Sequence, residues 1–329
     1  MQRLLSAMGL LTVAALLWPS HAFAQDHLSF KGVIFSDYNY VVSSPDEDLE
    51  GNNGFGFRRY RLTTDFDLSD TFDGRLRLEG DDGQTTDQGK PAPFIKDLYV
   101  RWNDAFGEGH RIQFGLFRPP LWGPSEDQWG YRALEKTIRD RVGIASSRDI
   151  GIGVDGPLNG DGSLSYHVAV GNNSGGKKET DKYKRVYGTL TYEVNDRTQV
   201  SAGSDYYTFD GGSALNWSAF AGHSMDKIRF GVEGFVSNRS LDNADDKDTR
   251  FGVSAYANTD LSDAYRLVLR YDRSERDNMG ADSHSDWFVV GLAYLADKNI
   301  QIIPNLIYEK QDADDNAELI ARLTLWAKF

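Results

Sequence analysis

The sequence predicts an all-β protein, a 16-stranded antiparallel transmembrane β-barrel, and the carboxy-terminal segment is the clearest indication. In residues 317–329 every second residue is apolar and most of the residues between are polar. This alternation is typical of a strand with lipid on one face and water on the other. The chain also ends inside that segment, on the aromatic residue Phe329. These features indicate a barrel of the outer membrane of a Gram-negative bacterium.

The amino terminus predicts export from the cytoplasm. A short basic head precedes an apolar run over 4–18, and Ala22-Phe23-Ala24 has the small-x-small pattern that signal peptidase cleaves. The run of about 15 residues is shorter than the roughly 20 that a spanning helix needs, so a signal peptide is favoured over a membrane anchor. We expect a signal peptide over 1–24 and a single outer-membrane β-barrel over 25–329.

Sixteen segments alternate with a period of two, and sixteen is even, as single-chain bacterial barrels require. Connectors after even-numbered segments are mostly short, whereas those after odd-numbered segments are mostly long and rich in Gly, Asn and Asp. This asymmetry is typical of short periplasmic turns and long outer loops. The expected strands are 28–42, 55–68, 74–82, 94–102, 110–118, 149–156, 162–171, 183–194, 199–209, 214–223, 227–237, 249–258, 264–272, 285–295, 300–310 and 317–329.

The alternation also predicts which side chains face the water-filled interior. On the second segment Tyr60 and Leu62 are expected to face lipid, which leaves Arg59 and Arg61 for the lumen. Arginine stays charged and offers five donors in a planar fork, so a row of arginines is suited to passing an anion along a wall. The expected pore-lining residues are Arg59, Arg61, Arg75, Arg77, Tyr99, Arg101 and Arg111.

A structural explanation of the same arginines remains open. With the turn centred near residue 71, Asp67 would face Arg75, Asp65 would face Arg77, and Arg61 would face Asp81. Such cross-strand pairs stabilise a wall and cancel its charge. This pairing is favoured for Arg75 and Arg77, whereas a solute path is favoured for Arg59 and Arg61.

Five blocks within residues 55–175 follow one another in a specific order and spacing. They are Phe57-Arg58-Arg59-Tyr60-Arg61-Leu62, Arg75-Leu76-Arg77-Leu78-Glu79-Gly80, Ile95-Lys96-Asp97-Leu98-Tyr99-Val100, Ile112-Gln113-Phe114-Gly115-Leu116-Phe117-Arg118-Pro119-Pro120 and Arg148-Asp149-Ile150-Gly151-Ile152-Gly153-Val154. This stretch resembles the phosphate-selective porin O and P family. The resemblance implies a sixteen-stranded, trimeric channel with an arginine-lined lumen and an inward-folded third loop. The binding lysines of that family's loop are represented by Lys136 alone.

The third outer loop, 119–148, is the longest connector, and a long loop in a compact protein is usually functional. We expect it to fold into the lumen, to form the constriction and to contain a short helix over 133–139. Its basic residues are nearly balanced by Glu126, Asp127, Glu135 and Asp140. The expected constriction residues are Arg118, Trp122, Arg132, Lys136, Arg139 and Arg141.

The expected function is passive diffusion of small polar or anionic solutes, with phosphate and other oxyanions as candidates and no reaction catalysed. Expected partners are outer-membrane lipid, lipopolysaccharide, small solutes or inorganic anions, and two further copies in a homotrimer. The net charge of −13 argues against nucleic acid. Two alternatives remain open: a carbohydrate-type porin with a path lined by Trp122, Trp129, Tyr131 and Tyr99, and a non-conducting adhesin or envelope anchor.

No cofactor, metal or catalytic residue is expected. The sequence Gly151-Ile152-Gly153-Val154-Asp155-Gly156 spells a dinucleotide fingerprint, but it alternates as a strand where the motif needs a strand-to-helix turn. The histidines are scattered, and no serine lies in a nucleophile-elbow pattern. The acidic segments 242–248 and 312–315 are explained by solvated loops; calcium coordination or bridging to lipopolysaccharide is the alternative.

Overall fold

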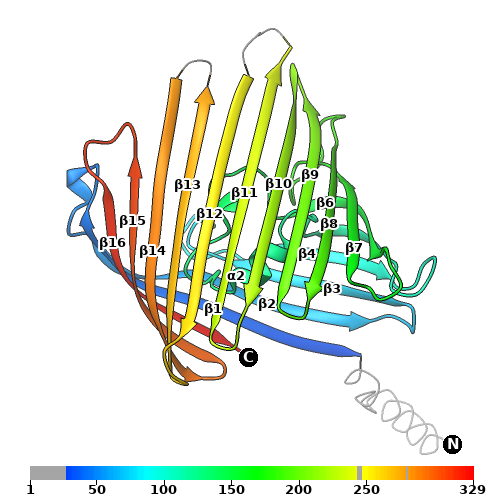
Figure 1. The fold of residues 1–329 in the computed structure, drawn as a ribbon, viewed down its shortest axis with the longest axis horizontal. Coiled ribbons are helices and arrows are strands. Elements are labelled where there is room, and N and C mark those ends of the chain that lie inside the picture. Colours follow the sequence, from blue (N-terminus) through cyan, green and yellow to red (C-terminus); the bar gives the residue numbers. More distant parts are fainter. Residues whose placement is uncertain (1–26, 243–246, 279–280) are drawn as a thin grey trace, which may run out of the picture.

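The chain forms a closed β-barrel in which β1 pairs with β16 and every neighbouring pair is antiparallel (Figure 1). This is a computed structural model, and it describes residues 27–242, 247–278 and 281–329. The predicted signal peptide, 1–24, lies outside the described residues, as does most of the acidic segment 242–248. The predicted barrel of sixteen strands is confirmed.

The strands, in chain order, are β1 Leu28–Ser43, β2 Asn53–Asp67, β3 Phe72–Gly80, β4 Phe94–Trp102, β5 Arg111–Phe117, β6 Asp149–Pro157, β7 Leu164–Gly171, β8 Arg185–Asn195, β9 Thr198–Phe209, β10 Gly212–Ser224, β11 Ile228–Leu241, β12 Lys247–Asp260, β13 Tyr265–Asn278, β14 Ala281–Asp297, β15 Ile300–Gln311 and β16 Glu318–Lys328. The described helices are η1 Glu47–Leu49, α2 Gly123–Trp129 and α3 Ile138–Arg141. In the described part of the chain, no helix has the length and apolarity to cross a membrane.

The two faces of the strands follow the predicted alternation. On β16, Leu323 and Leu325 are 47% and 40% exposed on the outer face, whereas Thr324 between them is fully buried. The last residue also closes the barrel, because Phe329 and Gly32 of β1 exchange backbone hydrogen bonds. A Cβ atom at Gly32 would lie 2.0 Å from the Phe329 ring, so only glycine leaves room for this ring at the seam.

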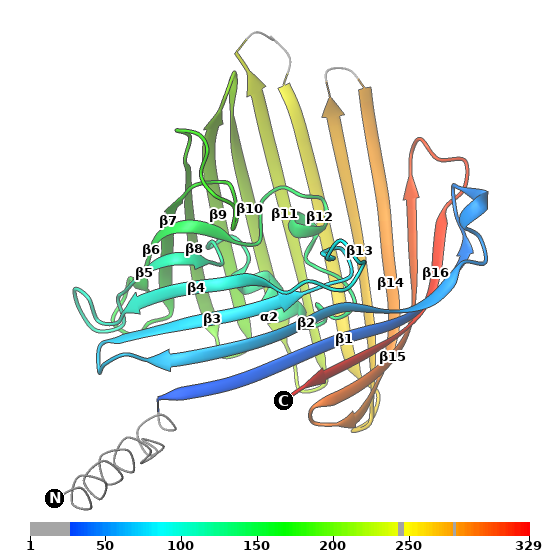
Figure 2. The ribbon, with the colours of Figure 1, turned by 180° about the vertical axis from the view of Figure 1, so that it is seen from behind.

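The wall of the barrel is uneven in height. Strands β9 to β14 are long and stand upright in Figure 1, whereas β2 to β4 lean strongly and the wall on their side is low (Figures 1 and 2). Strands β3 to β8 have seven to eleven residues, and β9 to β15 have twelve to seventeen. Strand β2 has fifteen residues but leans beside β3 (Figure 2). We call β2 to β8 the short wall and β9 to β15 the tall wall.

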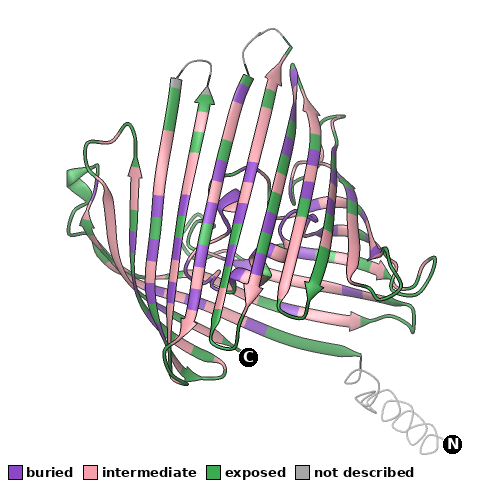
Figure 3. Ribbon diagram, in the orientation of Figure 1, coloured by how far each residue is buried: buried purple, intermediate pink, exposed green. Residues whose placement is uncertain are grey.

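The connector between β5 and β6, residues 118–148, folds into the barrel and packs against the tall wall. Leu134 and Trp129 of this loop join inward-facing residues of the tall wall, such as Val268, Val289 and Ile303, in one buried apolar cluster. The buried bands on the tall strands in Figure 3 show the same region. The loop therefore fills the tall-wall side of the lumen, and the expected inward folding is found.

The prediction of a short helix over 133–139 is wrong. The loop instead forms α2, which has a proline in its first turn and ends at Gly130 with φ of 71°. Proline suits the first turn of a helix because its missing N–H has no partner there, and glycine adopts the left-handed conformation that stops it. Residues 131–135 form a turn, and α3 begins only at Ile138.

Candidate pore constriction

The loop is held in the lumen largely through its own backbone. Arg270 of β13 donates to the carbonyl of Lys136 at 2.5 Å, and Arg322 of β16 donates to that of Leu134 at 2.7 Å. Asn258 of β12 donates to the Trp129 carbonyl at 3.1 Å. Hydrogen bonds from charged donors contribute more than neutral ones. These bonds fix the path of the loop across the barrel.

Two of the predicted constriction residues are anchors and do not line the water path. Arg139 is buried and donates to Glu233 and Ser218, both at 2.8 Å. Trp122 is 1% exposed, packs in a cluster with Phe117 and Tyr187, and donates its indole N–H to a loop carbonyl. The expectation that Trp122 and Arg139 form the constriction is therefore corrected. A buried carboxylate such as Glu233 needs a paired cation, which explains where Arg139 lies.

The aromatic path of the carbohydrate-type alternative is also absent from the water-filled space. Trp129 is 1% and Tyr131 4% exposed, both in the apolar cluster between the loop and the tall wall. The Trp129 ring contacts the rings of Tyr131 and Tyr256. Of the four expected aromatic residues, Tyr99 alone lines the larger cavity. The three loop aromatics hold the loop in place.

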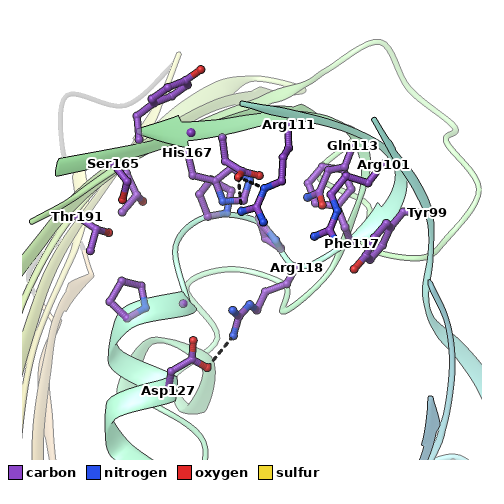
Figure 4. Close-up of a pocket in the computed structure, with 18 of the residues that line it drawn as sticks. Tyr99, Arg101, Arg111, Gln113, Phe117, Arg118, Asp127, Ser165, His167 and Thr191 are labelled. Carbon is purple, nitrogen blue, oxygen red and sulfur yellow. Dashed lines mark hydrogen bonds and ion pairs between the residues drawn. The ribbon is translucent and has the colours of Figure 1, made fainter. Parts of the chain in front are cut away.

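Two cavities lie along the short wall, on either side of the loop. The larger has a volume of about 840 Å³ and opens toward the turns, and the smaller, of about 490 Å³, opens toward the outer loops. Figure 4 shows side chains from several strands pointing into the larger cavity. Cationic residues that line the larger cavity are Arg75, Arg77, Arg101, Arg111, Arg118 and Arg148. Those that line the smaller are Arg58, Arg59, Arg132, Lys136 and Arg141.

Near the turns, arginines of the wall form cross-strand ion pairs, but their acidic partners differ from the predicted ones. Arg75 pairs with Asp65 at 2.5 Å, whereas the expected partner was Asp67. The strands turn about residue 70, since Asp67 lies opposite Asp73. Each arginine therefore lies opposite a residue two positions away from its predicted partner. A shift of two residues leaves every side chain on the predicted face of its strand. Arg101 with Asp73 and Arg111 with Asp155 complete the paired row.

At the level of the loop, several cations share one buried carboxylate. Glu79 of β3 is 1% exposed and lies 2.5 Å from Arg61, 3.1 Å from Lys96 and 3.8 Å from Arg59. Arg61, for which a solute path was favoured, is thus also ion-paired. Because one carboxylate cannot neutralise three cations, the local charge at this part of the wall is positive.

The next carboxylate along the wall repeats this arrangement. Asp97 of β4 is buried and pairs with Arg77 at 2.9 Å, and Arg148, at the end of the loop, also pairs with it. Arg77 was expected to face Asp65, but Thr63 lies opposite it on β2, so its ion pair is with the neighbouring strand β4. Two cations again share one carboxylate.

Two lumen cations, Arg58 and Lys96, were missed from the sequence because both lie at β-bulges. Regular alternation places each on the lipid side, yet Arg58 binds Asp37 at 2.6 Å and Lys96 binds Glu79, both inside the barrel. A bulge inserts one extra residue and re-aims a side chain. The sequence carries a readable signal of each bulge: two consecutive polar residues, 58–59 and 96–97, stand between outward apolar residues where one should stand.

The loop faces this wall with a mixed group of charges. Arg118 lies 3.3 Å from Asp127, as Figure 4 shows, and Arg132 lies 3.5 Å from Glu126 and 3.0 Å from Asp140. Burial alone would raise the pKa of the Glu126 carboxyl, but the charges of Arg132 and Arg118 outweigh burial and lower it. The loop side is therefore close to neutral, and the wall supplies the excess positive charge.

Carboxylates and cations also differ in how much water they meet. The side chains of Asp37, Glu79 and Asp97 are between 1% and 3% exposed. Their arginine and lysine partners are more accessible, from 7% for Arg322 to 25% for Arg58. These three carboxylates lie behind their cations. Other carboxylates also line the cavities, but cations outnumber them, six to four in the larger cavity and five to three in the smaller.

In the described ranges 27–242, 247–278 and 281–329, no group of three or more His, Cys, Asp or Glu residues is placed to hold a metal ion. His167 of β7 lines the larger cavity beside Arg111 and Asp155, as Figure 4 shows for His167 and Arg111. Its place on the wall is that of a lining residue.

A barrel of this size, narrowed by an inward loop and carrying water-filled cavities on both sides of it, is the architecture of a channel through the outer membrane. The family model described as Gram-negative porin matches residues 10–316, and the chain belongs to this family. The protein is an outer-membrane channel. A search of the curated proteins finds no match to the sequence.

Solved structures share the fold at low sequence identity. The anion-selective porin from Comamonas acidovorans is 13% identical with a TM-score of 0.69, over 92% of this chain and 99% of that one. The outer membrane channel DcaP of Acinetobacter baumannii is 14% identical with a TM-score of 0.67, over 92% and 96%. Outer-membrane expressed OmpT of Vibrio cholerae is 12% identical with a TM-score of 0.67, over 92% and 97%.

Proposed function

We propose that this porin is an anion-selective diffusion channel for small oxyanions, with inorganic phosphate among its solutes, and that it catalyses no reaction. The observation that carries the proposal is the layered charge of the short wall. Buried carboxylates at Glu79 and Asp97, and at Asp37 of the adjoining strand β1, hold cations whose other edges face the water. The similarity to an anion-selective porin agrees with this proposal.

The mechanism is partial replacement of water by fixed donors. An anion that enters the constriction loses part of its hydration shell, and guanidinium N–H groups on the wall supply hydrogen bonds in its place. Arg61 and Arg77 are kept in position by Glu79 and Asp97, so the donors need little rearrangement when the anion arrives. A cation meets the same groups as a barrier, because the compensating carboxylates lie behind them.

The reversal potential of the purified channel in a planar bilayer, under a potassium chloride gradient, tests this proposal. Anion selectivity together with block of chloride current by added phosphate is the expected result. A cation-selective current would reject the proposed selectivity and leave the porin assignment standing. Absence of current from folded protein would favour the adhesin or anchor alternative. The carbohydrate-type alternative has lost its main support, because Trp122, Trp129 and Tyr131 are buried.

We also propose a homotrimer embedded in outer-membrane lipid and lipopolysaccharide. One similar structure is the trimer form of OmpT from Vibrio cholerae. The short wall offers an apolar outer surface on which Phe114, 69% exposed, and Leu98 face outward. Mass measurement of the folded protein in mild detergent should give three chains. A monomer that conducts fully would reject the trimer.

A further inference from the structure

We propose that the two β-bulges of the short wall set the anion selectivity of the channel, through Arg58 on β2 and Lys96 on β4. This inference rests on the proposed anion-selective function and identifies residues that determine it. Neither cation belongs to the regular inward row of its strand. Each bulge therefore adds one positive charge to the lumen without removing a residue from either face.

The pairing of the strands shows how each bulge works. Phe35 of β1 lies opposite Arg59 and the next residue, Ser36, lies opposite Phe57, so Arg58 is skipped. On β4, Asp97 lies opposite Arg77 and Ile95 lies opposite Leu78, so Lys96 is skipped in the same way.

Without these insertions, Arg58 and Lys96 would fall on the lipid face, where a charged side chain is strongly unfavourable. The bulge re-aims each one toward water. The apolar residues on either side remain outside: Phe57 and Ile95 are 58% and 47% exposed.

Both bulge cations share a carboxylate that already has another cation. Glu79 has Arg61 at 2.5 Å in addition to Lys96 at 3.1 Å. Asp37 has Arg322 at 3.9 Å in addition to Arg58 at 2.6 Å. Since one cation is enough to neutralise each carboxylate, the bulge cation is surplus charge.

The position of this surplus makes it effective. Arg58 also donates to the loop carbonyl of Leu134 and lines the smaller cavity, so it lies where the loop meets the short wall. Lys96 lies beside Glu79, which is opposite Arg61 on the neighbouring strand. Charges separated by a few ångströms in a narrow, partly water-excluding passage interact several times more strongly than in bulk water. One added charge there changes ion permeation more than one on the outer surface.

The test compares single-charge variants with the wild-type channel by reversal potential. Lys96→Gln and Arg58→Gln should each lower the chloride-to-potassium permeability ratio by roughly threefold or more, and the double variant should lower it further. Arg273→Gln is the matched control, because it removes the same charge from the outer face of β13, where Arg273 pairs with Glu275 and Asp286. The control should leave the ratio unchanged.

The outcomes separate the inference from the function on which it rests. The wild-type ratio tests anion selectivity, and the shift of the variants relative to wild type tests the bulges. Folded variants with an unshifted ratio would overturn the inference even if the wild-type channel prefers anions. A shift equal to that of Arg273→Gln would overturn it too, because net charge would then explain the effect.

A deletion gives a second, independent measurement. Removing Lys96 joins Ile95 to Asp97 and restores strict alternation on β4, with Ile95 outside and Asp97 inside. The shortened strand should still form the barrel, since its faces stay correct, and its permeability ratio should match that of Lys96→Gln. A folded deletion variant with the wild-type ratio would contradict the proposal.

Discussion

Single arginines in this lumen have different functions according to what each one binds. Arg139 and Arg270 are buried, and they hold the loop through a carboxylate, a hydroxyl or a backbone carbonyl. Arg61 and Arg77 bind buried carboxylates and keep an edge toward the water. Residue type and spacing look alike in both groups. The partner on another strand or on the loop decides the function.

Glu126 provides a prediction at this scale. The Glu126→Gln variant should be less stable than wild type at pH 7 by about 1–3 kcal/mol, because Arg118 and Arg132 lose a charged acceptor. Thermal unfolding in detergent, followed by circular dichroism, measures the difference.

The pH dependence of that difference follows from the lowered pKa of Glu126. Its pKa in the folded protein lies below the ordinary value of 4.5, so the stabilisation is complete above pH 4.5. It is lost as the pH falls through the folded pKa. The gap between wild type and Glu126→Gln should therefore close only below pH 4.5. A gap that closes between pH 7 and pH 5 would contradict the assignment.

At the scale of elements, the strands were predictable and the path of the loop was not. Lipid outside and water inside impose a period of two on every strand, and that period is visible in the sequence. The partners of the loop, such as Arg322 with Leu134 or Arg270 with Lys136, are more than a hundred residues apart. Their pairing depends on how the closed barrel places strands, which no local pattern records.

Particular residues show where local patterns mislead. Trp122 and Arg139 carry the right chemistry for a constriction but are buried as anchors. The bulges at Arg58 and Lys96 were detectable in principle, since the apolar phase slips by one residue at each. The sequence of β14 carries a second readable signal, because its inner face is apolar: Trp287, Val289 and Ala293 are buried there. An apolar inner face indicates that another part of the chain covers it.

We predict that loss of the Arg270 side chain loosens the loop from the tall wall. Arg270→Met removes the bond to the Lys136 carbonyl and leaves Asp272, which is fully buried, without its closest cation. Breaking one partner of a buried pair costs about 3–5 kcal/mol. We expect a lower unfolding temperature and larger, noisier single-channel currents. The control Arg273→Met changes a paired arginine on the outer face of the same strand, and its currents should stay at the wild-type level.

The molecule as a whole is a barrel whose cross-section is larger than its water path. The loop and the apolar cluster occupy the tall-wall side, and the cavities follow the short wall. The net charge of −13 belongs to the whole chain, yet the constriction carries surplus positive charge. The net charge of a whole chain is therefore a poor guide to the selectivity of its pore, because it adds the charges of the outer loops to those of the lumen.

The orientation of the tall wall in lipid gives a prediction at the whole-molecule scale. Val232 is 50% exposed on the outer face of β11, between Phe230 and Gly234. Val232→Arg should destabilise the folded barrel by about 2–4 kcal/mol, because it places a charge in the apolar band. Denaturant titration in lipid vesicles measures the change.

The matched control is Asn238→Arg on the same face, six residues nearer the outer loops. It should cost about 0–1 kcal/mol, since the penalty falls toward the membrane surface. Equal penalties at both positions would mean that the membrane contacts the barrel at a different height.

The way the loop is anchored has a consequence for evolution. The bonds from Arg270, Arg322 and Asn258 end on backbone carbonyls, which every amino acid possesses. A mutation that replaces the side chain of Lys136, which lines the smaller cavity, keeps the acceptor that holds the loop. Side chains that face the solute can therefore vary under selection while the scaffold that positions them stays the same. A change of solute preference therefore requires only point mutations in the constriction, with the position of the loop preserved.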